Sequence, residues 1–477
     1  MCGVTVSASA QEASEVESLK KQLQQVKEQF EKAQQEYQKQ IDALAKKLDE
    51  VIQRQNQPAA ETTKPKPTVA APVTGPEKPP APPAASLEKV PWSASQPITL
   101  SRAGPAYMNI SFDALMDAGW SSASDPSAKL QLGDDDPIKR GFTLPNTEIV
   151  LDGAVDPYFK GVADIVFKLD KDNETQVELE EVYLQTTALP GKLQVKAGQA
   201  YLNFGRQNPQ HPHQWAFVDQ PLILNRAFGP EGLRNVGGQI SWVLPTPFYA
   251  EGFLGVFDGQ GSTAFSFRNP GEDDGTGVNR FHGRQTLDRQ LRGLGDLLFV
   301  PRLASSFDLT ETQTLLVGAS AAFGPNDTGG HERTQIYGVD LYWKWKPANA
   351  TKGFPFASWQ TEALYQRFEA GADDSVSLPA EKLEDWGFYS QVLWGVKPRW
   401  VAGLRGEYVN GNSGADDAND VFRGERTRVS PNLTWYPSEF SKLRLQYNYD
   451  HGESFGTAHS VWMQMEFLLG AHAAHKF

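Results

Sequence analysis

The feature that most constrains this chain is a series of short segments in which apolar and polar residues alternate, from about residue 98 to its end. The stretch VWMQMEFLLG, at positions 461–470, is one of them. A period of two places successive side chains on opposite faces of a β-strand. The polar face carries charged residues in segment after segment, so this face needs water and the apolar face needs a different environment.

Four further segments show the same alternation, at 159–169, 337–346, 400–408 and 443–450. The connections also alternate: very short ones lie at 155–157, 190–192, 245–247 and 397–399, and long ones at 122–144, 206–235 and 260–296. An even number of strands with short turns at one end and long loops at the other is typical of a bacterial outer-membrane barrel. We therefore predict an all-β transmembrane barrel of about 16 antiparallel strands, in which lipid faces the apolar side and a wet lumen faces the polar side.

Two alternatives stay open for this region. A soluble all-β sandwich would turn its polar faces outward around a shared apolar core. The strand count would become fourteen or eighteen if a long loop hides a hairpin, and 260–296 is the longest candidate.

The balance of charge limits the partners. Asp and Glu number 58 against 45 Lys and Arg, and the whole acidic excess lies after Pro97. This argues against nucleic acid as a partner. No uninterrupted apolar run of about 18 residues occurs, which excludes a spanning helix and leaves strands as the means of crossing a membrane.

Residues 1–13 resemble the end of a secretory signal, because an Ala-Ser-Ala motif precedes Gln11. We expect cleavage before Gln11, with the true start of the signal missing; the other interpretation is a disordered N-terminus. Cys2 is the single cysteine, so an intrachain disulfide and cysteine-based metal sites are excluded.

Residues 14–56 are rich in Glu, Lys, Gln, Ala and Leu and contain no Gly or Pro. Apolar residues recur from Val16 to Tyr37 at steps of three and four, slip by four at Ile41 and resume to Val51, a heptad seam with a stutter. The segment predicts an α-helical coiled coil that oligomerises, with a single amphipathic helix as the alternative. Its mixed seam does not distinguish a dimer from a trimer. Residues 57–97 are dense in Pro and Ala and predict an extended linker, so that 98–477 forms the barrel.

One stretch resembles a known family. Residues 181–242 contain KAGQAYLNFG, a long loop with NRAFGPEGLRNVGGQISW, and a new strand. This stretch of sequence is similar to that of the phosphate-selective porins, also called the porin O and P family. The resemblance implies a trimer of sixteen-stranded barrels whose third long loop folds inward to narrow the pore. By strand count, 206–235 is the third long loop, although His211, Pro212, His213 and Trp215 depart from the simpler polar run expected there.

The predicted site residues fall into two groups. The predicted constriction loop carries Arg206, His211, His213, Asp219, Arg226, Glu231 and Arg234. The predicted lumenal positions are Lys160, Asp164, Lys168, Asp340, Lys344, Arg405, Glu407, Arg426, Arg428 and Arg444. Both signs are present, which favours a general or weakly selective pore over a phosphate-selective one. Charges in the loop either orient dipolar solutes or attach the loop to the barrel wall, and both interpretations stay open.

The sequence offers little sign of other chemistry. His211 and His213 stand two apart in a Pro-broken loop without an evident third ligand, and His472 and His475 fall on opposite faces of a strand, so we predict no metal site and no cofactor. GEDDGTGVN lacks the ligand pattern of a calcium loop. No G-x-S-x-G motif occurs, so no enzyme is expected.

The sequence therefore predicts an outer-membrane porin of a Gram-negative-type bacterium that forms a water-filled channel for passive diffusion of small hydrophilic solutes or ions. The expected partners are outer-membrane lipid, the barrel-assembly machinery, which the terminal Phe477 would engage, and two further copies in a homotrimer. The coiled coil would lie in the periplasm, where it could contact the cell wall. The alternatives are a structural anchor with a plugged barrel and an outer-membrane hydrolase.

Overall fold

The computed structural model describes residues 96–420 and 422–470. The chain divides into two units, 1–87 and 88–477, and every described residue belongs to the second. The predicted coiled coil, nearly all of the predicted linker, and His472, His475 and Phe477 lie outside the described residues. Within the described part, no helix has the length and apolar character needed to cross a membrane.

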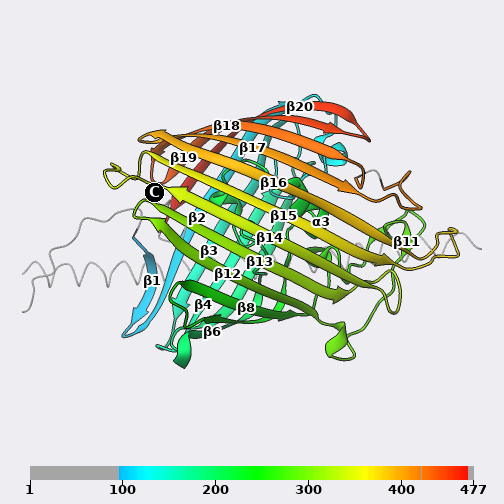
Figure 1. The fold of residues 1–477 in the computed structure, drawn as a ribbon, viewed down its shortest axis with the longest axis horizontal. Coiled ribbons are helices and arrows are strands. Elements are labelled where there is room, and N and C mark those ends of the chain that lie inside the picture. Colours follow the sequence, from blue (N-terminus) through cyan, green and yellow to red (C-terminus); the bar gives the residue numbers. More distant parts are fainter. Residues whose placement is uncertain (1–95, 421, 471–477) are drawn as a thin grey trace, which may run out of the picture. The chain divides into compact units, whose positions relative to one another are not determined.

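Sixteen antiparallel strands form a closed barrel (Figure 1), which confirms the predicted all-β barrel and its strand count. Each strand pairs with its neighbours in chain order, and the last pairs with the first, from Phe112↔Leu469 to Ser121↔Ser460. The strands are β2 (Ala106–Ser121), β3 (Gly141–Ala154), β4 (Phe159–Leu169), β5 (Thr175–Thr186), β6 (Leu193–Tyr201), β7 (Arg234–Val243), β8 (Tyr249–Phe257), β12 (Leu298–Thr310), β13 (Gln313–Pro325), β14 (Arg333–Trp345), β15 (Phe356–Ala370), β16 (Glu381–Lys397), β17 (Trp400–Gly411), β18 (Arg426–Ser438), β19 (Ser441–Gly452) and β20 (Gly456–Leu469).

A seventeenth strand, β1 (Ile98–Ala103), forms a hairpin with β2 and stands outside the ring of sixteen. It pairs with β2 from Ala106 to Ile110, while β20 pairs with β2 from Phe112 onward. Since β3 occupies the other edge of β2, β1 continues the edge that β20 leaves uncovered. This pairing satisfies backbone groups that would otherwise be free at the seam.

The alternation of the sequence maps onto the two faces of the barrel. Along β20, Val461, Met463, Met465 and Phe467 are 43–52% exposed on the outer face. The intervening Trp462, Gln464 and Glu466 are almost completely buried inside. The same division runs through the other strands, so an apolar outer surface surrounds a polar interior. The closed ring also pairs the backbone groups of every strand, as a chain in lipid requires.

Most connections at the two ends differ in length as predicted; the exceptions are 346–355, which is long for the turn end, and 453–455, which is short for the loop end. One end has the turns 155–158, 187–192, 244–248, 311–312, 346–355, 398–399 and 439–440, and the other has the loops 122–140, 170–174, 202–233, 258–297, 326–332, 371–380, 412–425 and 453–455. The loop 258–297 does contain paired strands, β9 (Glu272–Asp273), β10 (Asn279–Phe281) and β11 (Arg284–Gln285), but they form a separate small sheet. The count of sixteen therefore stands. The short helices are α2 (Pro126–Lys129), α3 (Leu222–Phe228), η1 (Pro190–Lys192), η2 (Pro212–Gln214), η3 (Ser262–Ala264) and η4 (Leu294–Asp296).

The small sheet is fastened to two neighbouring loops. Arg280 donates to Asp274 at 2.9 Å and to Asp373 at 2.7 Å. Arg284 donates to the carbonyl of Gly371 at 2.8 Å, and the His282 ring pairs with Asp420 at 2.5 Å. These contacts join loops 258–297, 371–380 and 412–425 into one assembly, called here the loop cap.

Candidate functional site

The loop 202–233 leaves the barrel wall at the end of β6 and returns at the start of β7, and between these points it crosses the interior. We call it the crossing segment. All seven residues of its helix α3 are buried, and so are most of its other residues. A surface loop would expose one side of such a helix, so complete burial places α3 inside the ring of strands. The crossing segment spans the region predicted from sequence as the constriction loop.

A sharp turn starts the crossing segment. Gly205 has a left-handed backbone, with φ of 62°, and a Cβ at this position would lie 2.1 Å from Oε2 of Glu362 on β15. Oε1 of Glu362 accepts the backbone N–H groups of Arg206 at 3.1 Å and Gln207 at 2.7 Å. Tyr389 on β16 donates its hydroxyl to the same carboxylate at 2.7 Å. The turn thus requires glycine, and a buried carboxylate on the barrel wall holds it.

Asp219 fastens the middle of the segment to the opposite wall. Its carboxylate pairs with Arg405 on β17 and, at 3.0 Å, with Arg428 on β18. Gln446 and Asn448 on β19 donate to it at 2.8 and 2.7 Å. Burial alone would raise the pKa of Asp219, but the two arginines hold it below its usual value. Three strands therefore converge on one carboxylate that stays charged.

Three other predicted loop charges also bind within the protein. Arg226 donates to the backbone carbonyls of Phe422, Arg423 and Gly424, the last two at 3.1 and 3.0 Å. Arg234 pairs with Glu178 on β5 and with Glu231 at 2.8 Å. These contacts hold the segment in place, and Arg226 also lies 3.8 Å from the carboxylate of Asp385, so both arginines have an acidic partner.

Arg206 is different. Its guanidinium is half-buried, donates to Gln360 at 3.2 Å and lies 3.9 Å from the centre of the Tyr342 ring. No carboxylate among the described residues forms an ion pair with Arg206. Among the three arginines of the predicted constriction loop, Arg206 is therefore the one whose charge no described carboxylate balances.

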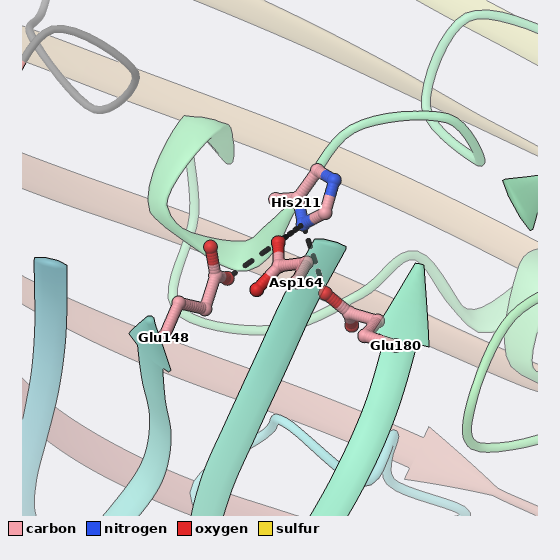
Figure 2. A group of neighbouring side chains, drawn as sticks. All are labelled: Glu148, Asp164, Glu180 and His211. Carbon is pink, nitrogen blue, oxygen red and sulfur yellow. Dashed lines mark ion pairs between the residues drawn. The ribbon is translucent and has the colours of Figure 1, made fainter. Parts of the chain in front are cut away.

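His211 and His213 lie against the wall formed by β2 to β5. Nδ1 of His211 is 2.9 Å from Glu180, 3.4 Å from Asp164 and 3.7 Å from Glu148. Figure 2 shows the histidine, from the crossing segment, above the three carboxylates from neighbouring strands. Nδ1 of His213 is 2.8 Å from Asp113 and 3.2 Å from the second oxygen of Glu148.

The environment of the two rings is strongly acidic. Nε2 of His211 lies 3.1 Å from Glu181, and the two imidazoles stack with centroids 5.7 Å apart. Burial alone would lower the pKa of His213, but Glu148 and Asp113 raise it to about 10. Sequence reasoning found both histidines and Asp164 but missed Asp113, Glu148, Glu180 and Glu181 as neighbours.

The remaining predicted lumenal residues also face the interior. Lys168 pairs with Asp134 and with Glu178 at 2.9 Å, and Asp340 pairs with Arg302 on β12 at 2.5 Å. Arg405 contacts Glu407 at 2.7 Å, Arg426 and Arg428 share Asp450 at 2.6 and 2.9 Å, and Arg444 donates to Gln464 at 2.9 Å. Lys160 is exposed and Lys344 half-buried, and neither forms an ion pair with a described residue.

Part of the interior is apolar rather than wet. Phe204, Leu222 and Phe228 of the crossing segment pack in one cluster with inward-facing residues such as Ile336 on β14 and Leu364 on β15. Gly338 makes room for this packing, since a Cβ there would lie 2.6 Å from the Phe204 ring. The strand pattern predicts a polar lumen throughout. The apolar cluster forms because the crossing segment places its own apolar side chains inside the barrel.

Comparison with known proteins gives one relative by sequence and several by fold. No family model matches the chain. An uncharacterized protein of Aquifex aeolicus (strain VF5) is 33% identical over 358 residues, which cover 71% of this chain and 71% of that protein.

Among solved structures, the outer membrane channel DcaP of Acinetobacter baumannii has a TM-score of 0.51 at 12% identity, over 77% of this chain and 99% of that one. The anion-selective porin from Comamonas acidovorans has a TM-score of 0.48 at 8% identity, over 76% of this chain and 100% of that one. The likeness to DcaP concerns the fold and agrees with a porin-type barrel.

Proposed function

The chain belongs to the same family as the Aquifex aeolicus protein, and we propose that this chain forms a water-filled channel in the outer membrane of a Gram-negative-type bacterium. It would pass small hydrophilic solutes or ions by diffusion, without catalysis. The observation that carries the proposal is the crossing segment: a closed barrel with an apolar outer surface holds, inside a charged interior, a loop fastened to opposite walls. Such a loop narrows a passage without being free to leave it.

Arg206 is proposed to set the weak selectivity of this channel. The other loop charges are matched by partners, whereas Arg206, Lys160 and Lys344 have no ion pair among the described residues. An uncompensated cation at a narrow point lowers the energy of a passing anion and raises that of a cation. The net charge of −13 belongs to the whole chain and is not concentrated at this point.

The test is single-channel conductance and reversal potential in a planar bilayer under a salt gradient, with the refolded full chain. Arg206→Gln is expected to shift the reversal potential toward cation preference. Arg367→Gln is the matched control, because Arg367 lies on the outer face of β15, away from the interior. An equal shift in both variants would remove Arg206 from the proposal.

A correctly folded barrel that conducts no ions would reject the channel itself. The apolar cluster inside the barrel would then favour the alternative of a plugged structural anchor. A hydrolase is the second alternative, and the sequence offers it no G-x-S-x-G motif.

Assembly is also proposed. The resemblance to the phosphate-selective porins and the predicted coiled coil both support a homotrimer, with the coiled coil in the periplasm and possible contact with the cell wall. Phosphate selectivity is not favoured, because most interior arginines are paired with carboxylates. The mass of the protein in detergent tests the trimer, and a monomeric full-length chain would contradict it.

A further inference from the structure

The strongest unexplained feature is the group of carboxylates around His211 and His213, called here the carboxylate cluster. It consists of five acidic side chains from four adjacent strands, each at most 7% exposed: Asp113 on β2, Glu148 on β3, Asp164 on β4, and Glu180 and Glu181 on β5. The channel proposed above makes no use of this cluster.

A β-bulge creates part of the cluster. Glu181 pairs across the ladder with Asp164, and Leu179 pairs with Ile165, so that Glu180 has no partner of its own. The extra residue turns both Glu180 and Glu181 inward, while Leu179 on one side and Val182 on the other are exposed on the outer face. An ordinary strand would place only one of two consecutive glutamates inside.

The arrangement is unfavourable without a cation. Asp113 stands directly opposite Glu148 in the ladder, and Asp164 stands directly opposite Glu181. Like charges in directly opposed positions destabilise a sheet, and burial makes the repulsion stronger. Two protonated imidazoles would balance at most two of the five carboxylates.

Asp164 gives an independent sign that the cluster binds a ligand. It is 1% exposed, it points into the cluster in Figure 2, and neither of its oxygens accepts a hydrogen bond from any described residue. Its ion pair is with His211, at 3.4 Å, so the cost of the lost hydration of this buried carboxylate is only partly compensated. A bound metal ion would remove that cost.

We propose that His211, Glu148, Asp164 and Glu180 bind one divalent transition-metal ion, which fastens the crossing segment to the wall of β2 to β5. One ligand atom from each residue lies within 4.8 Å of the other three. The distances from Nδ1 of His211 to the three carboxylates, 2.9, 3.4 and 3.7 Å, bracket the spacing of about 3.4 Å between tetrahedral ligands placed ~2.1 Å from a metal.

The surroundings complete such a site. Glu181 lies next to Nε2 of His211, as a carboxylate that orients a metal-binding imidazole does. Tyr201 donates its hydroxyl to the other oxygen of Glu180 at 2.7 Å. His213 lies 3.2 Å from the second oxygen of Glu148 and helps to hold that carboxylate in place, and Asp113 lies 2.8 Å from the same imidazole nitrogen. One imidazole with three carboxylates suits Zn²⁺, Mn²⁺ or Fe²⁺ better than Ca²⁺, which takes six to eight oxygens.

The test uses the full chain, stripped of metal with a chelator and refolded with Zn²⁺ because the site is buried. After dialysis, elemental analysis is expected to find one Zn²⁺ per chain that the Asp164→Asn and His211→Gln variants lose, with at least tenfold weaker binding. Glu181→Gln is expected to weaken binding by about 10–100-fold. Asp117→Asn is the matched control, since Asp117 is an equally buried interior aspartate on β2 outside the cluster.

Co²⁺ supplies a second measurement, because its visible absorption is much stronger in a four-coordinate protein site than in the six-coordinate hydrated ion. Folding of each variant is verified by its strand circular dichroism and its heat-dependent migration in gels. The proposal is overturned if the wild-type chain binds no more Zn²⁺ than the Asp164→Asn variant, or if Asp117→Asn loses the metal equally. If Asp164→Asn does not fold, a wild-type chain whose Co²⁺ spectrum stays that of the hydrated ion overturns it as well.

Discussion

Single charged residues inside this barrel act in matched groups. Asp219 is the clearest case, because it binds Arg405, Arg428 and two amide side chains from β19. A buried carboxylate is costly by itself, but its removal is costlier still, since it leaves two buried guanidinium groups short of a partner. The residue therefore matters for the position of the crossing segment as much as for the charge of the interior.

The first prediction concerns this residue. Asp219→Asn is expected to lower the free energy of unfolding by about 3 kcal/mol, the order found when one member of a buried ion pair is removed. It should also raise the fluctuation of the single-channel current, because the crossing segment loses its central attachment. Urea unfolding and bilayer recording measure the two effects. Asp308→Asn, at an exposed aspartate that accepts a hydrogen bond from Thr314, should change neither; equal losses in both variants would contradict the argument.

Residue-scale contacts were also the hardest to predict. The periodicity of the strands placed Asp164, Arg405, Arg428 and Asp340 inside, but any polar lumen would carry such residues. Which of them meet depends on the stagger of strands far apart in sequence. The bulge that turns Glu180 inward leaves no local sign except two adjacent glutamates, so the carboxylate cluster could not be inferred.

At the level of elements, the loops are organised by short polar contacts. In the loop cap, Arg280 of the small sheet joins Asp274 to Asp373 across two loops. Hydrogen bonds from Thr276 and Arg280 lower the pKa of Asp274 to about 2, and bonds from Ser375, the Gln285 backbone and Arg280 hold the pKa of Asp373 well below its usual range. The cap therefore depends on ionised carboxylates.

The second prediction follows from the sign of these shifts. Because both pKa values are lower in the folded state, the stabilisation is present above about pH 4 and is lost as pH falls through the folded values. Amide hydrogen exchange in 272–285, corrected for its intrinsic rate, should thus accelerate between pH 4 and 2, while exchange in the barrel strands stays slow. Arg280→Gln should raise exchange in 272–285 already at pH 6. A cap that keeps its protection at pH 2 would contradict this account.

Elements were predicted better than contacts. The clean alternation of β20 and the contrast of turns with loops both survive in the structure, because a barrel wall enforces a strict period of two. The crossing segment was located by counting strands. Its helix α3 was not predicted, since seven residues, LILNRAF, are too few for a helical period to be recognised. The small sheet in 258–297 was foreseen only as a possible hairpin.

At the scale of the whole molecule, one part of the chain supplies every strand of the barrel wall. All sixteen strands of the ring lie between Ala106 and Leu469, and β1 begins at Ile98. Each of these strands pairs with at least one other strand of the same region. The residues from Ile98 to Leu469 thus supply both the strand pairing that closes the barrel and the described contacts in its interior.

The third prediction tests whether the barrel folds without the N-terminal residues. A chain that lacks residues 1–87 should refold to the same barrel, with unchanged circular dichroism and unchanged conductance per subunit, because no wall strand is removed. If the coiled coil is what holds subunits together, the truncated chain should have a lower mass in detergent than the full chain. Loss of folding on truncation would show that the N-terminal unit takes part in the barrel.

The crossing segment also has a consequence for the order of assembly. The backbone N–H of Val218 donates to the side-chain oxygen of Gln446, 228 positions later in the chain, and His213 lies beside Asp113 on β2, the first strand of the ring. Contacts of such long sequence separation form late and slowly. The seam between β2 and β20 lies between the strand of Asp113 and the strand of Gln446. If β2 and β20 paired before the crossing segment had entered the barrel, the segment would stay outside. Entry of the crossing segment and closure of the ring therefore occur in one kinetic step. A chain slowed at this step would accumulate as an open sheet that has not yet enclosed the crossing segment.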